Sequence, residues 1–533
     1  MRILISDDLS PEAKSILERI PGAQVDFRVG LKPSELREVI GGYEALAVRS
    51  ATKVTKDILD AAHKLRVVGR AGTGVDNIDL AAASRRGVVV MNAPGGNSVS
   101  VAEQTIALLL ALARQIPEAS QSTRAGKWEK KKFAAGRELM GKTLGVIGTG
   151  NIGALVVKRA QAFGMKVLGY DPFLAAEAAE KLGIELVDLT EIWKRSDAIT
   201  LHVPLTEQTK NMVGAAQLAQ MKPGALLVNC ARGGLVDEKA VAEALKAGKL
   251  GGAALDVFEQ EPPPADHPLF SCPNFIATPH LGGSTEDAQQ NVATIVCEAM
   301  VDYLTTGTVR NAVNVPSVSG EVLERLGPFL RLCEKMGSLS GQLVLEGDTA
   351  AAPEQIEIAY AGEVAQQPTA PLTAAVLKGV LGTFLAEPVN EVSAPALAKE
   401  RGLSVTQVKR NETPDFASLV NVRLRSKAGS TEVAGTIVGK REPRIVRVNE
   451  FEVEAAPQGT VLVMINQDKP GVIGNVGRTL GEAQVNIAQF ALARVAETGR
   501  ALALVNIDGT ASPETLDKLR KLPHVLQVRQ VVL

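Results

Sequence analysis

The sequence predicts an α/β protein with two doubly wound parallel-sheet domains, followed by two smaller α+β domains. From residue 1 to about residue 285, short apolar and β-branched runs alternate with amphipathic helical stretches. This alternation is typical of parallel sheets with helices on both faces, and it has too many units for one sheet. After about residue 320 the alternation stops and strand-like runs follow one another directly.

The parallel-sheet part contains nine clear strand candidates. They are RILIS (2–6), ALAVR (45–49), RVVGR (66–70), GVVVMN (87–92), TLGVIG (143–148), KVLGY (166–170), AITLHV (198–203), GALLVNC (224–230) and GAALDV (252–257). Helical patterns lie between them, for example at 98–115 and 237–248. A further helix, 286–306, would carry the chain back to the first domain, so we expect one domain of 1–95 plus 287–316 and a second of 96–286.

The remaining part begins with a linker-like stretch at 309–320 and a helix at 321–343, and we expect a third domain at 317–455. Its antiparallel strands would be SLVNVRLRSK (418–427), TEVAGTIVGK (431–440) and PRIVRVNEFEVEA (443–455). Residues 456–533 then show a strand–helix–strand–strand–helix–strand order, which is that of a ferredoxin-like domain.

Composition excludes several classes of protein. The 533 residues carry a formal charge of -1 and no long block of like charge, which argues against nucleic acid as a partner. No apolar run reaches the roughly 18 residues of a membrane-spanning helix, so we expect no membrane partner. The four cysteines, at 230, 272, 297 and 333, lack metal-ligand spacing and fit thiols in a reducing cytoplasm, and no metal is expected.

A glycine-rich turn gives the strongest functional signal. The strand at 143–148 runs into Gly148-x-Gly150-x-x-Gly153, a helix follows, and the next strand ends at Asp171. Such glycines allow a tight turn and a close approach of pyrophosphate to the helix N-terminus, while the acidic residue binds the ribose hydroxyls. We therefore expect a Rossmann-like domain that binds NAD, since Asp171 would repel the 2′-phosphate of NADP.

Three polar residues follow strands of the same domain, namely Arg232, Glu261 and His280. Ligands of open parallel sheets bind beyond the carboxyl ends of the strands, so these side chains should converge. Histidine titrates near neutrality and suits proton transfer, arginine offers a planar fork for a carboxylate, and a glutamate beside the histidine would orient its ring. This set fits the oxidation of a hydroxy acid.

The motifs GTGNIG (148–153), CARGG (230–234), DVFEQEP (256–262) and PHLGGST (279–285) resemble the D-isomer-specific 2-hydroxyacid dehydrogenases. The resemblance implies that His280 is the acid–base catalyst, that Glu261 supports it, and that Arg232 binds the substrate carboxylate. It also implies a set of cofactor contacts. These are Thr73, Gly148, Gly150, Asn151, Ile152, Gly153, Asp171, Val203, Cys230, Ala231, Arg232, Asp256, His280, Gly282 and Gly283.

Within this family, ALAVRSATKVT (45–55) and VVGRAGTGVDNIDL (67–80) look like segments of the long-form phosphoglycerate dehydrogenases. The resemblance implies D-3-phosphoglycerate as the substrate, on the path to L-serine, and also admits reduction of 2-oxoglutarate. The implied substrate contacts are Arg49, Ser50, Arg70, Gly74, Asn97, Lys130, Arg232 and His280. Lys130 lies in the basic run GKWEKKKF (126–133), which is equally consistent with a solvated surface. The resemblance implies instead that this run lies near the mouth of the active site, where it could reach across a dimer interface.

The last domain resembles the ACT domain, an amino-acid-binding regulatory module, over NQDKPGVIGNVGRTLGEAQVNIAQF (466–490). It implies L-serine as an effector held by Asn466, Asp468 and Asn486, in a homodimer or homotetramer. The alternative that this domain serves only to assemble the oligomer stays open. Two other functions also stay open: another D-2-hydroxyacid dehydrogenase activity, and a non-enzymatic NAD-sensing role on the same fold.

Overall fold

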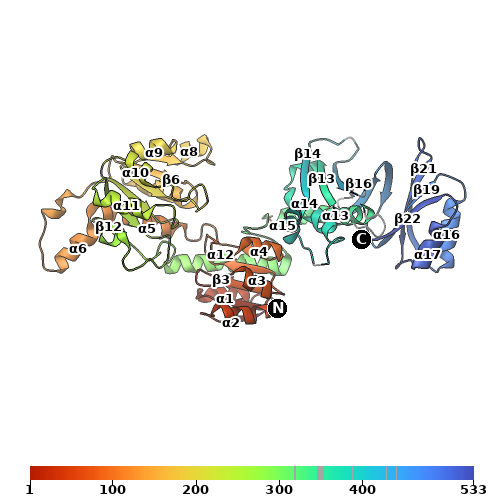
Figure 1. The fold of residues 1–533 in the computed structure, drawn as a ribbon, viewed down its shortest axis with the longest axis horizontal. Coiled ribbons are helices and arrows are strands. Elements are labelled where there is room, and N and C mark those ends of the chain that lie inside the picture. The colour runs from red at the N-terminus through yellow and green to blue at the C-terminus, as the bar shows by residue number, and fades with distance from the viewer. Residues whose placement is uncertain (317–319, 345–352, 387, 414, 428, 440) are drawn as a thin grey trace.

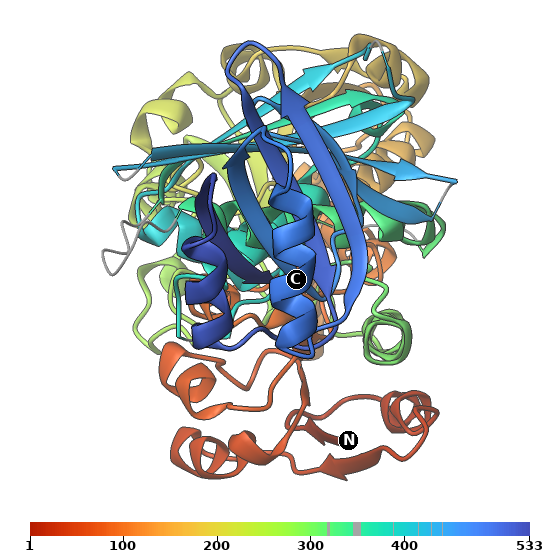
Figure 2. The same cartoon turned by 90° about the vertical axis from the view of Figure 1, so that its right-hand side faces the viewer.

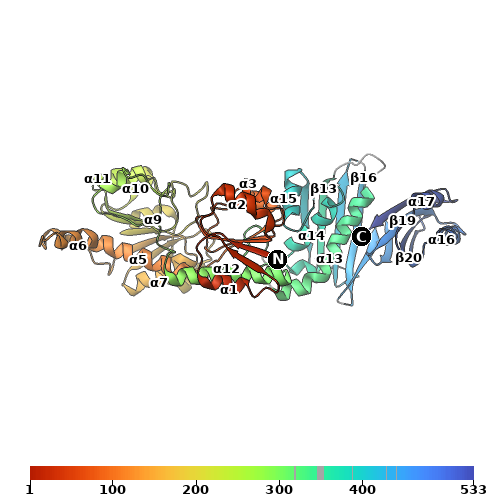
Figure 3. The ribbon, with the colours of Figure 1, turned by 90° about the horizontal axis from the view of Figure 1, so that it is seen from below.

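The structure, a computed structural model, describes residues 1–316, 320–344, 353–386, 388–413, 415–427, 429–439 and 441–533. Each of four sheets forms a domain with its helices, and we name these the first to fourth domains in the order of their sheets. Along the molecule the second domain stands at one end, then come the first, third and fourth domains (Figures 1 and 3). The fold class predicted from the sequence is confirmed.

The first domain is a five-stranded parallel sheet of order β2-β1-β3-β4-β5. Its apolar strands are buried on both faces, with a hydrophobic core on each side. The strands are β1 (Arg2–Ile5), β2 (Gln24–Phe27), β3 (Ala45–Val48), β4 (Val67–Arg70) and β5 (Val89–Met91). The helices are α1 (Pro11–Leu17), α2 (Pro33–Val39), η1 (Ile40–Gly42), α3 (Lys56–Ala61), α4 (Leu80–Arg85) and α12 (Glu286–Thr306), the last of which packs on α1 and β4.

The second domain is a seven-stranded parallel sheet of order β12-β11-β10-β9-β6-β7-β8, whose strand order reverses between β6 and β9. Its strands are β6 (Thr143–Ile147), β7 (Lys166–Tyr170), β8 (Glu185–Leu186), β9 (Ala198–Leu201), β10 (Ala225–Asn229), β11 (Leu250–Leu255) and β12 (Phe275–Ala277). Its helices are α5 (Ser98–Arg114), α6 (Ile116–Arg124), η2 (Lys132–Ala135), α7 (Asn151–Ala162), α8 (Ala176–Leu182), α9 (Leu189–Arg195), α10 (Ala215–Gln220), α11 (Glu238–Lys246) and η3 (Pro268–Ser271). The helix expected at 98–115 bends at Gln115, where φ is +50°, and continues as α6.

The third domain is a six-stranded mixed sheet of order β14-β13-β15-β16-β17-β18, in which only the β13–β14 pair is parallel. Of the expected linker at 309–320, residues 317–319 lie outside the described residues. The elements are α13 (Gly320–Val344), β13 (Pro353–Gly362), η4 (Glu363–Gln366), α14 (Ala370–Leu381), α15 (Ser393–Glu400), β14 (Ser404–Arg410), β15 (Ser418–Ser426), β16 (Gly429–Val438), β17 (Glu442–Val448) and β18 (Phe451–Ala455). Helix α13 covers β15, β16 and β17.

The fourth domain has the expected ferredoxin-like order, with an antiparallel sheet of order β20-β21-β19-β22. Its elements are β19 (Thr460–Gln467), α16 (Val472–Glu482), β20 (Ile487–Val495), β21 (Arg500–Ile507), α17 (Pro513–Arg520) and β22 (Val525–Val532). Both helices cover one face of the sheet (Figure 2), and residues of the other face share a core with the third domain.

The third domain also contacts the first, through α15 and α4. The Asn390 side chain donates a hydrogen bond to the Gly87 carbonyl at 2.9 Å, Arg85 pairs with Glu400 at 3.4 Å, and Val392 packs on the core of the first domain. In the described residues no single helix has the length and apolar composition to cross a membrane, although α5 and α6 meet those criteria together as a bent pair.

Candidate active site

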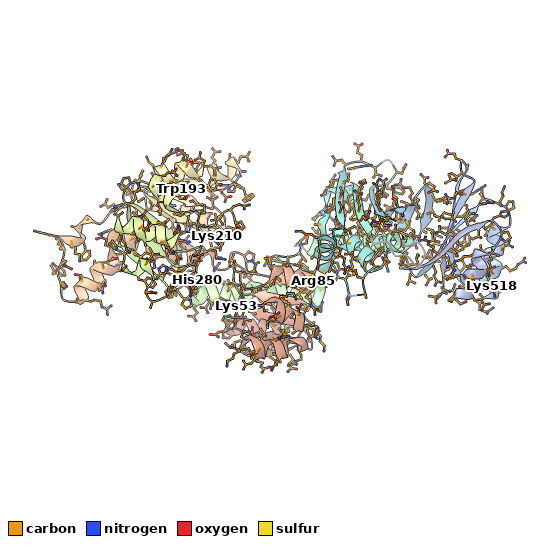
Figure 4. The ribbon with its side chains drawn as sticks, in the orientation of Figure 1. Lys53, Arg85, Trp193, Lys210, His280 and Lys518 are labelled. Carbon is orange, nitrogen blue, oxygen red and sulfur yellow. The ribbon has the colours of Figure 1, made fainter. Side chains whose placement is uncertain are left out.

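A cleft of about 1250 Å³ lies between the first and second domains and is lined by loops that follow parallel strands of both sheets. Lys53 of the first domain and His280 are both labelled at this junction in Figure 4. The expected site residues that line the cleft are Arg49, Ser50, Arg70, Thr73, Gly74, Asn97, Ile152, Val203, Cys230, Ala231, Arg232, Asp256, Glu261, His280, Gly282 and Gly283. The cleft thus brings together most of the residues that the sequence indicated, from both domains.

The glycine-rich turn joins β6 to α7 at the point where the strand order of the second sheet reverses. Gly148 has a φ of +89°, which glycine adopts easily, and a Cβ on Gly153 would collide with the Gly148 carbonyl oxygen. Gly150 is the N-cap of α7, forms no side-chain cap, and has open space where a side chain would stand. The first N–H groups of α7, including that of Asn151, can therefore receive a pyrophosphate.

Asp171 follows β7 and lies beside this turn. Its carboxylate accepts hydrogen bonds from the Thr149 N–H at 3.0 Å, the Thr149 hydroxyl at 3.1 Å and the Phe173 N–H at 3.0 Å. Burial acts to raise the pKa of Asp171, but these hydrogen bonds outweigh it and leave the pKa below its ordinary value. The carboxylate is therefore ionised and fixed, as a ribose-binding carboxylate must be.

His280 and Glu261 form a direct pair at the cleft. His280 Nδ1 lies 2.8 Å from Glu261 Oε2, and Glu261 Oε1 accepts a hydrogen bond from the Phe258 N–H at 3.0 Å. Both side chains are partly exposed, at 53% for His280 and 38% for Glu261. Because Nδ1 is held by the glutamate, Nε2 is the ring nitrogen that can exchange a proton with a ligand in the cleft.

The backbone around His280 is organised by Asp256, which was expected to contact the cofactor. Its buried carboxylate accepts hydrogen bonds from the Thr278 hydroxyl at 2.5 Å and from the N–H groups of Leu281 and Gly282, both at 2.8 Å. The His280 N–H donates to the Asp256 carbonyl at 2.9 Å, and His280 itself has a φ of +55°. Asp256 thus holds the turn that presents the histidine.

A second histidine–glutamate pair, which is largely buried, supports the loop that carries Glu261, and sequence reasoning missed it. Glu238 accepts a hydrogen bond from the Glu259 N–H at 2.8 Å and lies 2.8 Å from His267 Nε2. The side chains are 14% and 8% exposed. Because the two residues are far apart in the sequence and carry no recognisable motif, only the folded chain reveals the pair.

Three cationic side chains of the first domain line the cleft: Arg49, Lys53 and Arg70. Arg49 donates to the Ser284 hydroxyl at 3.4 Å. Arg70 is committed to its own loop, since it donates to Asn77 Oδ1 at 2.7 Å and to the Gly74 carbonyl at 2.5 Å. Lys53 was not among the expected residues, although it lies in the same segment as Arg49. Its position adds an exposed ammonium group at the cleft.

The cationic side chains of the cleft are close enough to affect one another's charge. Burial is the main factor that lowers the pKa of Arg70, and the positive charges of Arg232 and Arg49 lower it further. Arg232, from the second domain, forms an ion pair with Asp76 of the first domain at 3.1 Å. Asn97 accepts a hydrogen bond from the Thr73 hydroxyl at 2.7 Å. The cleft therefore offers converging positive charge to an anionic ligand.

The other expected residues lie outside the cleft lining. Lys130 follows α6, which stands at the outer end of the second domain (Figure 1). In the fourth domain, Asp468 pairs with Arg494 at 2.5 Å and Asn486 donates to Asp508 at 2.8 Å. Asn466 is buried and donates to the neighbouring Gln467 carbonyl. Each of the three expected effector residues therefore forms its hydrogen bond or ion pair with a residue outside this set.

Models of known families match three parts of the chain. Residues 106–282 match the NAD-binding domain of the D-isomer-specific 2-hydroxyacid dehydrogenases. Residues 325–449 match the D-3-phosphoglycerate dehydrogenase intervening domain, and residues 460–524 match the ACT domain. The three matches follow the order of the second, third and fourth domains.

Among solved structures, the E. coli D-lactate dehydrogenase is 30% identical with a TM-score of 0.52, covering 59% of this chain and all of that one. The NAD complex of the Staphylococcus aureus formate dehydrogenase is 30% identical with a TM-score of 0.53, covering 60% of this chain and all of that one.

Among curated relatives, the D-3-phosphoglycerate dehydrogenase of Methanocaldococcus jannaschii is 44% identical over 99% of both chains. The Archaeoglobus fulgidus enzyme of the same name is 42% identical over the full length of both chains, and that of Bacillus subtilis is 38% identical over 99% of both. At this identity and coverage, the chain belongs to the D-3-phosphoglycerate dehydrogenases, within the family of D-isomer-specific 2-hydroxyacid dehydrogenases.

Proposed function

We propose that this chain oxidises D-3-phosphoglycerate to 3-phosphooxypyruvate with NAD, the first step from glycolysis toward L-serine. The observation that carries the proposal is the cleft itself, which combines the His280–Glu261 pair with cationic groups from two domains. A substrate with a hydroxyl group, a carboxylate and a phosphate needs each of these features. The alignments cover 99% to 100% of the three curated D-3-phosphoglycerate dehydrogenases. This coverage supports assigning the activity in their shared name to this chain.

In this mechanism the C2 hydroxyl gives its proton to Nε2 of His280 as the C2–H bond breaks. Glu261 accepts the hydrogen bond from the Nδ1–H group and stabilises the positive charge that the ring acquires. Bound NAD, held by the turn before α7 and by Asp171, would supply the acceptor for the hydride that leaves C2. Both electrons of the C2–H bond leave with that hydride, so the product is a 2-oxo acid and one proton stays on the histidine.

Substrate recognition is divided between the two domains. Arg232 would bind the carboxylate through its planar fork, which matches two carboxylate oxygens. Arg49 and Lys53 would bind the phosphate, which carries a charge of about −1.5 to −2 at pH 7. Arg70, which is also among the expected substrate contacts, donates to Asn77 and to the Gly74 carbonyl, and we propose that it contributes its charge from within that loop. An unphosphorylated monocarboxylate would use only part of this set.

The residues around the second-domain turn fit NAD. The open space at Gly150 and the uncapped start of α7 suit the pyrophosphate, and Asp171 suits the adenosine ribose hydroxyls. The lowered pKa of Asp171 keeps its charge near neutral pH, which disfavours the extra phosphate of NADP.

The test is NADH formation by the purified chain with D-3-phosphoglycerate, its L-isomer and a panel of unphosphorylated D-2-hydroxy acids. We expect the highest kcat/KM with D-3-phosphoglycerate. A clear preference for an unphosphorylated acid would favour another dehydrogenase of the family, and binding of NAD without turnover of any hydroxy acid would favour a sensing role.

Four finer parts belong to the same proposal. The cationic groups that accept a phosphate would also accept the distal carboxylate of 2-oxoglutarate, whose reduction would run the same chemistry in reverse. L-serine would bind the fourth domain as an effector. The exposed Trp128 and Met140, 84% and 76% accessible, support a homo-oligomer in which the segment of Lys130 reaches a partner. The four free cysteines support a cytoplasmic location.

A further inference from the structure

An ion pair crosses the cleft between Arg232 and Asp76. Asp76 lies on the loop between β4 and α4 of the first domain, whereas Arg232 lies on the loop after β10 of the second domain. Arg232 Nε donates to Asp76 Oδ2 at 3.1 Å. The pair therefore links the two domains at the residue that the proposed function assigns to the substrate carboxylate.

The pair fixes the plane of the Arg232 guanidinium. Nε is held by Asp76, Nη1 donates to the Ala231 carbonyl at 2.7 Å, and Nη2 lies against Gly74, where any Cβ would collide with it. Nη2 forms no hydrogen bond among the described residues and Nη1 has a second N–H, so the Nη1–Nη2 edge can still receive a ligand. That edge has the spacing of a carboxylate.

Stability does not explain the presence of Asp76. Its side chain is 69% exposed, and exposed ion pairs contribute little to folding. Direct attraction of the ligand does not explain it either, because a carboxylate beside an anion-binding site repels an anionic ligand. Its negative charge is close enough to act on Arg70 as well as on Arg232. An acidic residue at this position is favourable only if it improves the way in which a neighbouring cationic side chain binds the ligand.

We propose that Asp76 is a positioning residue, which orients the Arg232 guanidinium across the cleft for the carboxylate of the substrate. This inference rests on the proposed function, because it takes the carboxylate as the ligand of Arg232. It extends that function by assigning to the first domain a part in carboxylate recognition, beside its part in phosphate recognition.

The experiment compares Asp76→Ala, Asp76→Asn and the control Asp57→Ala, an exposed acid on α3 of the same domain. KM and kcat are measured with D-3-phosphoglycerate and with an unphosphorylated D-2-hydroxy acid. Asp76→Ala should raise both KM values by a similar factor of about 3 to 10, the scale of one lost hydrogen bond, because both acids share the carboxylate. Asp76→Asn should restore KM to the unmodified value or lower, since its amide oxygen still accepts from Nε and no longer repels the substrate.

Three results would overturn the proposal: a lower KM in Asp76→Ala, a loss confined to the phosphorylated substrate, or an Asp76→Asn variant as impaired as Asp76→Ala. Failure of the proposed function looks different, because the unmodified chain would then oxidise neither acid. In that case a crystal structure of Asp76→Ala decides the role of Asp76 directly. A guanidinium of Arg232 that stays in its place without the carboxylate would refute the positioning role, and a displaced one would support it.

Discussion

His280 and Glu261 meet through one nitrogen and one oxygen, with Nδ1 lying 2.8 Å from Oε2, while Oε1 of the same glutamate is bound by the Phe258 N–H. The backbone thus holds the Glu261 carboxylate in place, and the carboxylate in turn orients the His280 ring. This arrangement determines which ring nitrogen does the chemistry, and it separates two effects that mutations can measure: loss of the base and loss of its orientation.

Replacing His280 with Ala removes the base and should lower kcat by about 100-fold or more, the usual scale for general acid–base catalysis. NADH binding should be retained, because the pyrophosphate site lies on the turn before α7. Glu261→Gln keeps the base and should lower kcat by a smaller factor. Steady-state kinetics with fluorescence titration of NADH measure both effects. His63→Ala, on an exposed histidine, is the control, and near-normal turnover of His280→Ala would rule out the mechanism.

Replacing Asp171 should change the choice of cofactor. Asp171→Asn keeps the size of the side chain but removes its charge, so the variant should use NADP better and NAD somewhat less well. Asp171→Ala should weaken NAD further, since it also loses the ribose hydrogen bonds. The measurement is kcat/KM with each cofactor. Equal use of NAD and NADP by the unmodified chain would contradict the role given to Asp171.

The cations of the first domain should separate into two kinds. Arg49→Ala and Lys53→Ala should raise KM for D-3-phosphoglycerate about 10- to 100-fold more than KM for an unphosphorylated acid, the range for a lost charge-assisted hydrogen bond. Arg70→Ala should impair both substrates alike, because its guanidinium holds Asn77 and the Gly74 carbonyl and thereby the loop of Asp76. A phosphate-selective defect in Arg70→Ala would show that its loop contacts are secondary.

His202 should make the protein sensitive to acid. Its Nδ1 atom is enclosed and has no hydrogen-bond partner among the described residues, Nε2 lies 3.1 Å from the Thr200 hydroxyl, and burial lowers the pKa of His202 to about 3. In the unfolded chain the pKa is about 6.5, so the unfolded state takes up this proton first. The contribution of neutral His202 to the free energy of unfolding is therefore complete above about pH 6.5. It is lost as the pH falls toward 3, by about 1.4 kcal/mol per pH unit.

The comparison is between the unmodified chain and His202→Gln, whose amide can reach Thr200 without titrating. The drop in Tm from pH 7 to pH 5 should be smaller in the variant, and His63→Gln should leave it unchanged. Asp171 and Asp197 have lowered pKa values and titrate at lower pH, outside this window. An identical drop in all three proteins would place the acid sensitivity elsewhere.

L-serine should bind the fourth domain and slow turnover, with a coupling free energy of about 1–3 kcal/mol as is typical of allosteric enzymes. Asn486→Ala and Asp468→Asn should weaken the inhibition and leave uninhibited turnover unchanged. Glu514→Ala, an exposed residue of α17, is the control. Calorimetry and inhibition curves test the prediction. Absence of serine binding to the unmodified chain would leave the fourth domain with an assembling role.

The sequence predicted the parts of the fold that depend on local pattern. Apolar runs buried on both faces, such as Ala45–Val48 and Ala198–Leu201, identified the parallel sheets, and the turn at Gly148 identified the cofactor site. The third domain was predicted less completely. Strands β13 and β14 pair in parallel although some 40 residues and two helices separate them, and no local pattern encodes such a pairing.

The site shows the same division between local and distant information. His280, Glu261 and Arg232 each follow a strand, so the topology of a parallel sheet was enough to place them together. The pairs Glu238–His267 and Arg232–Asp76 join segments far apart in sequence, and they depend on side-chain geometry that only the folded chain provides. The hydrogen bonds of Arg70 likewise distinguish it from Arg49, which sequence spacing alone could not do.

The contact of α15 with α4 has a mechanical consequence. It attaches the third domain, and through the shared core the fourth, to the same domain that carries Arg49 and Lys53. The chain passes between the first and second domains just before α5 and just before α12. If the cleft opens by bending at these two crossings, the second domain moves as one body. The first, third and fourth domains then form the other body.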